Sequence, residues 1–168
     1  MSLQSAQLEV KLAIRDQIDA GITTQSNIPV NIDFDGTNTY TPGTTANCCN
    51  KSAYYSGTLV ATTVSIDLSA LVVSTGGGGS GFNHIRSILI VNMETTDGHN
   101  LTVGGAGSNP LYEFFSASTG KSVIMANGRW LAEKPLGTIG FLTDTTHKIL
   151  LLDSGANTVQ YEMFVMGD

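Results

Sequence analysis

The segment from Thr158 to Met166 has the clearest pattern in this chain and constrains its fold most. Successive side chains of a β-strand point to opposite faces, so residues two apart share a face. One face here is apolar throughout and consists of Val159, Tyr161, Met163 and Val165. The other face starts polar and turns apolar at Phe164 and Met166. We therefore expect both faces of this strand to be buried near its end. One face would pack on the core of its own domain, and the other would pack on a second surface.

Similar segments elsewhere predict an all-β protein with around eight strands. They cover residues 28–34, 56–73, 86–93, 101–103, 122–125, 129–132 and 147–152. Glycine-rich turns separate them, and Asn127-Gly128 is a hairpin signal. Residues 88–91 have no polar break, which predicts a strand buried on both faces. Short strands without alternating helices favour an antiparallel β-sandwich of the jelly-roll type.

The N-terminal segment predicts the one helix, over residues 3–20. Leu8, Leu12 and Ile18 fall near one helical stripe, which Val10 and Ile14 widen. A lone short helix is marginal in water, so this one must pack on its own sandwich or on a neighbouring subunit. We expect a helical arm over 1–22, with Leu8, Leu12 and Ile18 as its interface residues, and a sandwich domain over 23–168. A polar loop is expected from Asp35 to Ser52.

The low charged fraction and the negative net charge narrow the classes of molecule that the protein is expected to bind. Charged residues make up 13% of the chain, against a usual share of about 25%. The net charge is −6, and the few Lys and Arg residues are scattered, which disfavours binding to nucleic acid. No apolar run approaches the roughly 20 residues of a membrane span, and the N-terminus lacks the pattern of a signal peptide. We expect the protein to be made in the cytoplasm, with no membrane partner.

No motif in the sequence indicates catalysis, a cofactor or a metal. The three histidines, His84, His99 and His147, match no ligand spacing, and no serine lies in a Gly-x-Ser-x-Gly elbow. We therefore expect no enzymatic activity, no cofactor and no metal site. The adjacent cysteines, Cys48 and Cys49, are expected to be reduced thiols in a loop, and the sequence leaves their role open.

Aromatic residues are the candidates for contacts of the sandwich. Trp130 follows a turn and is expected to anchor the core or an interface. Tyr161 and Phe164 are the other expected interface residues of the sandwich. A carbohydrate site would instead need several exposed aromatics on one face. Its candidates are Tyr54, Tyr55, Tyr112, Phe114 and Phe115.

Four segments of the C-terminal part resemble a group of small virion proteins of tailed bacteriophages. These segments are LTVGGAGSNPL (101–111), NGRWL (127–131), HKILLLDSGA (147–156) and VQYEMFVMG (159–167). The group includes jelly-roll decoration, or cement, proteins, which bind outside an assembled capsid as dimers or trimers. It usually has Pro-Gly where this chain has Asn127-Gly128.

The resemblance implies a structural protein on the capsid surface of a virion. Its partners would be further copies of itself and the major capsid protein. A carbohydrate-binding or receptor-binding β-sandwich of a phage tail or fibre is the alternative. The sequence leaves open dimer or trimer, head or tail, and the face that contacts the capsid.

Overall fold

The computed structural model describes residues 6–18, 28–40, 49–73, 81–104, 108–111, 115, 119–133, 141–143 and 146–168. All regular structure in these residues is β, with no helix. No helix in the described part of the chain has the length and apolarity needed to span a bilayer. The strands are β1 (Ala6–Ile18), β2 (Ile28–Tyr40), β3 (Lys51–Val60), β4 (Thr63–Asp67), β5 (His84–Asn92), β6 (Leu101–Gly104), β7 (Lys121–Ile124), β8 (Arg129–Glu133), β9 (Phe141–Leu142), β10 (Ile149–Asp153) and β11 (Thr158–Gly167).

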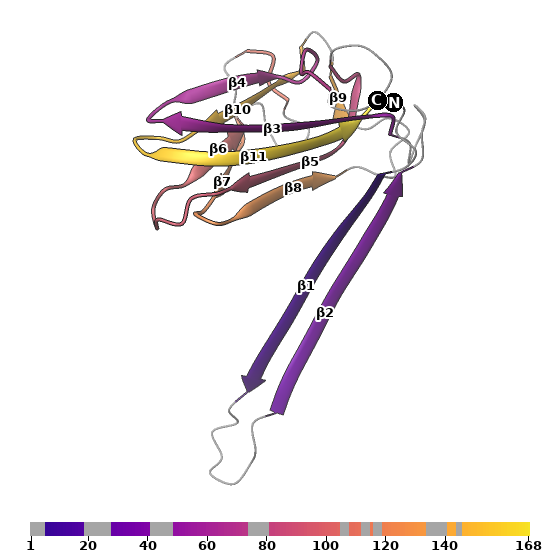
Figure 1. Ribbon diagram of the computed structural model, residues 1–168, viewed down its shortest axis with the longest axis vertical. Coiled ribbons are helices and arrows are strands. Elements are labelled where there is room, and N and C mark those ends of the chain that lie inside the picture. Colours follow the sequence, from indigo (N-terminus) through magenta and orange to yellow (C-terminus); the bar gives the residue numbers. More distant parts are fainter. Residues whose placement is uncertain are drawn as a thin grey trace. The chain divides into compact units, whose positions relative to one another are not determined.

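Residues Ala6–Thr39 form a compact unit of their own, in which β1 and β2 make a two-stranded sheet (Figure 1). The predicted helix over 3–20 is wrong for Ala6–Ile18, which is a strand. Apolar residues recur at every second position in this segment, at Leu8, Val10, Leu12 and Ile14. This two-residue period is that of a strand, although the same residues also fit a broad apolar stripe on a helix. The predicted loop from Asp35 is also wrong at its start, because β2 continues to Tyr40. The expected domain boundary after residue 22 falls between these two strands.

The second unit, which includes Tyr40–Asp168, contains two antiparallel sheets. One has the order β3-β11-β5-β8, with β9 also paired to β5, and the other has the order β4-β10-β6-β7. The pairs are nested along the chain: β3 pairs with β11, β4 with β10, β5 with β8, and β6 with β7. This confirms the all-β prediction, and the arrangement is β-sandwich-like, since the two sheets share one core.

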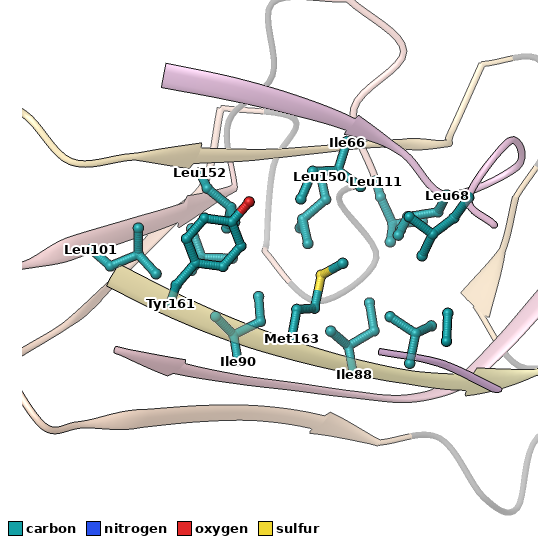
Figure 2. Close-up of a cluster of buried hydrophobic side chains, with 14 of the residues drawn as sticks. Ile66, Leu68, Ile88, Ile90, Leu101, Leu111, Leu150, Leu152, Tyr161 and Met163 are labelled. Atoms are coloured by element: carbon teal, nitrogen blue, oxygen red, sulfur yellow. The ribbon is translucent and has the colours of Figure 1, made fainter. Parts of the chain in front are cut away.

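Side chains from both sheets meet in a single hydrophobic cluster (Figure 2). Ile66, Leu150 and Leu152 come from the four-stranded sheet and face Ile88, Ile90 and Met163 of the five-stranded sheet. The apolar face predicted for β11 is confirmed, because Val159, Tyr161, Met163 and Val165 are all at most 3% exposed. Residues 88–91 of β5 are fully buried only on this inner side. Leu89 and Val91 point outward and are half-buried, so the prediction of a strand buried on both faces holds in part.

A small polar network closes the end of β4. Asp67 accepts hydrogen bonds from the Ser69 amide at 3.0 Å and the Ser69 hydroxyl at 2.6 Å, and it pairs with Lys148 Nζ at 2.9 Å. Burial alone would raise the pKa of Asp67, but the donors from Ser69 and Lys148 outweigh it, so the pKa is lowered from its ordinary value.

We predict that Asp67→Asn lowers the free energy of unfolding at neutral pH by less than about 1 kcal/mol, because the pair is partly exposed. A carboxyl with a lowered folded-state pKa stabilises the fold above its unfolded pKa and loses this contribution as the pH falls through the folded pKa. Urea titrations of both proteins at several pH values test this. The difference between them should shrink on acidification, and a difference that grows in acid would contradict the assignment.

Candidate functional site: the outer face of the five-stranded sheet

One apolar side chain from each of four neighbouring strands forms a continuous row on the outer face of the five-stranded sheet. Phe164 of β11 lies opposite Tyr54 of β3 on one side and opposite Leu89 of β5 on the other. Leu89 in turn lies opposite Leu131 of β8. Their chain neighbours on β5 and β11 point into the core, so these four residues point away from it. We call Tyr54, Phe164, Leu89 and Leu131 the apolar row.

The apolar row is accessible from outside. Tyr54 is 54% exposed, and Phe164, Leu89 and Leu131 are half-buried. A hollow of about 60 Å³ lies on this face, lined by Tyr54, Leu89, Val91, Glu162, Met163 and Phe164. Ligand pockets usually measure about 300–1,000 Å³, so this hollow has the size for one protruding side chain rather than for a small molecule. Its shape and lining therefore suit contact with another protein.

Charged residues flank the apolar row on both sides. On one side, two residues along each strand, are Ser56, Glu162, Val91 and Arg129. On the other side are Ser52, Met166, Ser87 and Glu133. The hydrogen bond between the Tyr54 hydroxyl and the Glu162 carboxylate raises the pKa of Tyr54. Ser52, Ser87 and Met166 are at most 8% exposed, so the chain itself covers much of the second side. The accessible part of the face thus combines an apolar centre with a polar edge at Ser56, Glu162 and Arg129, as in a protein interface.

The structure places the three predicted sandwich residues in different environments. Phe164 lies in the apolar row. Tyr161 is 3% exposed in the core, where burial raises the pKa of its hydroxyl. Trp130 lies opposite Ile90 on the inner side of β8 and stacks on Phe115, with ring centroids 5.9 Å apart. The structure therefore brings only Phe164 to the outer face.

The predicted arm residues Leu8, Leu12 and Ile18 belong to β1. Their side chains lie outside the part of the structure that is described. Their role as interface residues stays a prediction.

Two members of the apolar row, Leu89 and Leu131, were missed from the sequence, and Tyr54 was named only as a candidate for a carbohydrate site. The signal for Leu89 was present, since every second residue of an uninterrupted apolar strand must face outward. Leu131 and Tyr54 lie in the same row only because of the strand register, which pairs residues far apart in the chain. That register cannot be derived from local sequence patterns.

A buried charged cluster lies at the end of the same sheet. The Asp168 carboxylate contacts His84 Nδ1 at 2.7 Å and accepts a hydrogen bond from Arg86 Nη2 at 3.3 Å. The Arg86 and Asp168 side chains are 0% and 2% exposed. A register shift between Met166 and Gly167 leaves Arg86 without a partner position on β11, and such a bulge re-aims the side chain. Arg86 and Asp168 are closed to solvent, whereas the His84 side chain is 25% exposed. The cluster links β5 to the residue that follows β11 and so fixes this end of the sheet.

Cys49 is buried near this cluster, and its thiol donates a hydrogen bond to the Lys51 carbonyl at 3.1 Å. Burial raises the pKa of the Cys49 thiol above its ordinary value. A thiol with a raised pKa is a weak nucleophile at neutral pH. Cys48 lies outside the described residues. Within the described part of the chain, no three His, Cys, Asp or Glu side chains are grouped as metal ligands.

A second, more open cavity of about 310 Å³ lies beyond the flank of the apolar row. It is lined by Ser56, Gly57, Thr58, Met93, Gln160, Tyr161 and Glu162. Gly57 leaves space for the Tyr161 ring, because a Cβ there would lie 2.9 Å from the Tyr161 hydroxyl oxygen. The lining is mainly polar, so the cavity offers hydrogen bonds rather than an apolar seat.

The apolar row and its charged flanks are the surface with the clearest chemistry for binding in the described residues. Their arrangement supports contact with a protein surface across several strands. No protein-family model matches the chain, and neither a curated protein nor a solved structure matches it.

Proposed function

We propose that the protein is a structural protein of a virion, a decoration or cement protein that binds the outer surface of a phage head and stabilises the shell. The observation that carries this proposal is the apolar row on the outer face of a sheet whose inner face already packs on the core. An exposed apolar row on the outer face is stabilised further when another chain covers it. Binding through surface contact is what a cement protein does.

The order of the strands supports a jelly-roll topology for the second unit. If the two-residue β9 is left out, the remaining strands of this unit form four nested antiparallel pairs, from β3–β11 outside to β6–β7 inside. Folding such a nested ribbon over itself yields two four-stranded sheets, with orders β3-β11-β5-β8 and β4-β10-β6-β7. Two interlocked Greek keys of this kind make the double sheet of capsid-type jelly rolls.

The β1–β2 unit supports a role in reaching neighbouring capsid subunits. Each of its strands has 13 residues, which corresponds to about 43 Å at roughly 3.3 Å per residue. In sequence, Leu8 and Leu12 alternate with the polar residues Glu9 and Lys11. A ribbon with this alternation has one apolar face that can lie on another protein. We propose that Leu8, Leu12 and Ile18 make this contact.

The stabilising mechanism is mass action. A ligand that binds only the assembled shell stabilises it by RT ln(1 + [L]/Kd), which is about 2.7 kcal/mol per site when the free concentration is 100 times Kd. A phage head offers many equivalent sites. Contacts of modest strength at each site therefore add up to a large resistance against internal pressure.

We predict that the purified protein binds saturably to heads assembled from the major capsid protein of the phage that encodes it. Bound heads should withstand higher temperatures than bare heads before they release DNA. Cosedimentation measures binding, and a heating series followed by a dye that reports released DNA measures stability. Heads that neither bind the protein nor change their rupture temperature would contradict the proposal.

The alternative is a carbohydrate-binding or receptor-binding protein of a phage tail or fibre. The open cavity favours it, because Ser56, Thr58, Gln160 and Glu162 offer the hydrogen-bonding groups that a sugar needs. A glycan array with the isolated protein separates the two functions. Selective glycan binding that Gln160→Ala abolishes, together with no binding to heads, would support the alternative.

A further inference from the structure

Strand β3 lies at an open edge of the five-stranded sheet, because β11 is its only neighbour among the described strands. Thr58 of β3 lies opposite Gln160 of β11. The Gln160 amide donates to a Glu94 carboxylate oxygen at 2.9 Å, and the Gln160 carbonyl accepts from the Met93 amide at 2.8 Å. Both backbone groups of Gln160 are thus directed away from Thr58, so the backbone N–H and C=O of Thr58 point toward the open edge.

The same orientation recurs along the strand. Hydrogen-bonded and non-hydrogen-bonded pairs alternate along an antiparallel ladder, so Ser56 and Val60 are oriented like Thr58. The Ala61 amide agrees with this phase, since it donates across the ladder to the Asn157 carbonyl at 2.9 Å. The edge of β3 therefore offers a donor and an acceptor to a further strand at every second residue.

Strand β3 lacks the features that usually keep an edge strand from pairing with another chain. Such features are charged side chains, prolines, bulges and a short length. β3 has ten residues, its register with β11 continues without a shift, and residues 52–60 contain neither a charged residue nor a proline. Tyr54, Tyr55 and Val60 on this strand are also 54%, 45% and 66% exposed. The edge is therefore suited to pairing with another strand.

We propose that β3 of one copy pairs antiparallel with β3 of a second copy, which joins their five-stranded sheets edge to edge. An uncharged edge meets no like charge in its own copy, and the two-fold arrangement brings each backbone donor to an acceptor. The contact uses the same strand on both copies, so it closes after two chains and produces a dimer. This inference goes beyond the proposed function, because it concerns the isolated protein and requires no shell.

The accessible part of β3 sets the register of the pairing. Residues 52–53 are buried, so the accessible part covers residues 54–60. Pairing over all of this part places the two-fold axis at Gly57. Ser56 then lies opposite Thr58 of the second copy, and both residues direct their backbone groups to the shared edge.

The same register covers apolar side chains that a single copy leaves exposed. Tyr54 lies opposite Val60 of the second copy on the outer face, and Tyr55 lies opposite Leu59 of the second copy on the inner face. Pairs of an aromatic and a β-branched or aliphatic side chain across two strands stabilise a sheet. The two-fold axis repeats each contact, so the dimer gains two of each.

Edge-to-edge pairing leaves the outer face of each sheet open. The second copy lies beside the first in the same layer and does not lie over the apolar row. The two apolar rows become parts of one larger surface, so dimerisation and the proposed contact with a shell are compatible. Failure to dimerise and failure to bind heads are therefore separate results.

The natural full-length chain should form a dimer of modest affinity. The pairing buries mainly the edge of one strand per copy, which is less than the roughly 800 Å² per partner of a standard interface. We therefore expect a dissociation constant in the micromolar range. Sedimentation equilibrium measures it.

Thr58→Pro removes a backbone donor at the edge. Proline is tolerated in an edge strand where the amide faces outward, so the ladder between β3 and β11 should remain. Each dimer loses the two hydrogen bonds that the Thr58 amides donate. The dimer dissociation constant should therefore rise about tenfold or more.

Ser65→Pro, on β4 at an edge of the other sheet, is the matched control. The Leu68 amide donates to the Lys148 carbonyl at 3.0 Å, so by the same alternation the Ser65 amide also faces an open edge. Because β4 takes no part in the proposed pairing, the dissociation constant should stay within about twofold.

Cysteine cross-linking tests the register. Ser56→Cys and Thr58→Cys are made in separate chains and mixed under oxidising conditions. Residues directly opposite in a hydrogen-bonded pair have Cα atoms about 5.5 Å apart, which a disulfide can span. Identical positions of the two copies lie diagonally, beyond about 7 Å, so neither variant should cross-link by itself through its new cysteine. Peptide mass spectrometry identifies the link between positions 56 and 58.

Circular dichroism verifies that each variant is folded, and the cross-link decides the question if Thr58→Pro is not. The proposal is overturned if the natural chain is a monomer at about 100 μM or is a trimer. It is also overturned if Thr58→Pro weakens the dimer no more than Ser65→Pro does, or if the mixture forms no link between positions 56 and 58. A monomer whose Thr58 amide becomes protected from hydrogen exchange only on heads would show that a strand of the capsid protein takes this edge instead.

Discussion

Replacing Asp168 with asparagine is expected to lower the free energy of unfolding by about 3–5 kcal/mol, because the substitution removes the carboxylate that pairs with the buried Arg86 guanidinium. For a chain of this size the melting temperature should fall by about 10 °C or more. The backbone of Asp168 keeps its own contacts, since its amide donates to the His84 carbonyl at 2.9 Å and its carbonyl accepts from the Asn83 amide at 2.7 Å. Thermal and urea unfolding measure the change.

The matched control for this experiment is Asp97→Asn, in an exposed turn where the side chain accepts a hydrogen bond from the Gly98 amide. This change should alter the free energy of unfolding by less than about 0.5 kcal/mol. The double variant Arg86→Met with Asp168→Asn removes the buried positive charge as well. It should be more stable than Asp168→Asn alone. A loss below about 1 kcal/mol in Asp168→Asn would show that the cluster does not hold the end of the sheet.

Deleting residues 1–40 is expected to weaken binding to phage heads by about 100-fold or more, because the two units then no longer engage the shell together. The hydrophobic core should be unaffected, since all of its residues belong to the second unit. Cosedimentation with heads measures the loss of binding. Circular dichroism and a thermal melt verify that the shortened chain is folded.

Substitutions within β1 refine the same prediction. Leu8→Asn with Leu12→Asn should weaken head binding, because these changes remove the apolar positions of the strand. Glu9→Gln with Lys11→Gln changes the alternate positions by a similar number of atoms and should leave binding within about twofold. Full binding by the chain without residues 1–40 would reject the β1–β2 unit as the attachment element.

The strands that were predicted correctly have a local signal. In β11 the apolar residues recur at every second position, and the inner face of the strand is buried as expected. In β1 the same period was present, but Leu8, Leu12 and Ile18 also fit a helical stripe. Pairing with the neighbouring strand β2 is what makes this segment a strand rather than a helix. A two-stranded sheet depends on a partner in the chain, so a pattern within one segment does not decide between the two structures.

The candidate site depended on information that is not local. Phe164 was predicted from its position on the outer face of β11, whereas its neighbours Tyr54 and Leu89 are set by the strand register. The contact between Arg86 and Asp168 joins residues 82 positions apart, and it arises at a bulge that no local motif marks. Tyr161 was expected at an interface but lies in the core. An aromatic ring suits either place, and only its burial in the structure distinguishes the two.

The most direct measurement is electron cryo-microscopy of purified particles of the encoding phage, at a resolution that shows side chains. The account predicts this chain on the outer surface of the head, with Phe164 and Leu89 packed beneath another protein chain. Particles that lack the chain, or that carry it with the Phe164 side of the sheet open to solvent, would contradict it.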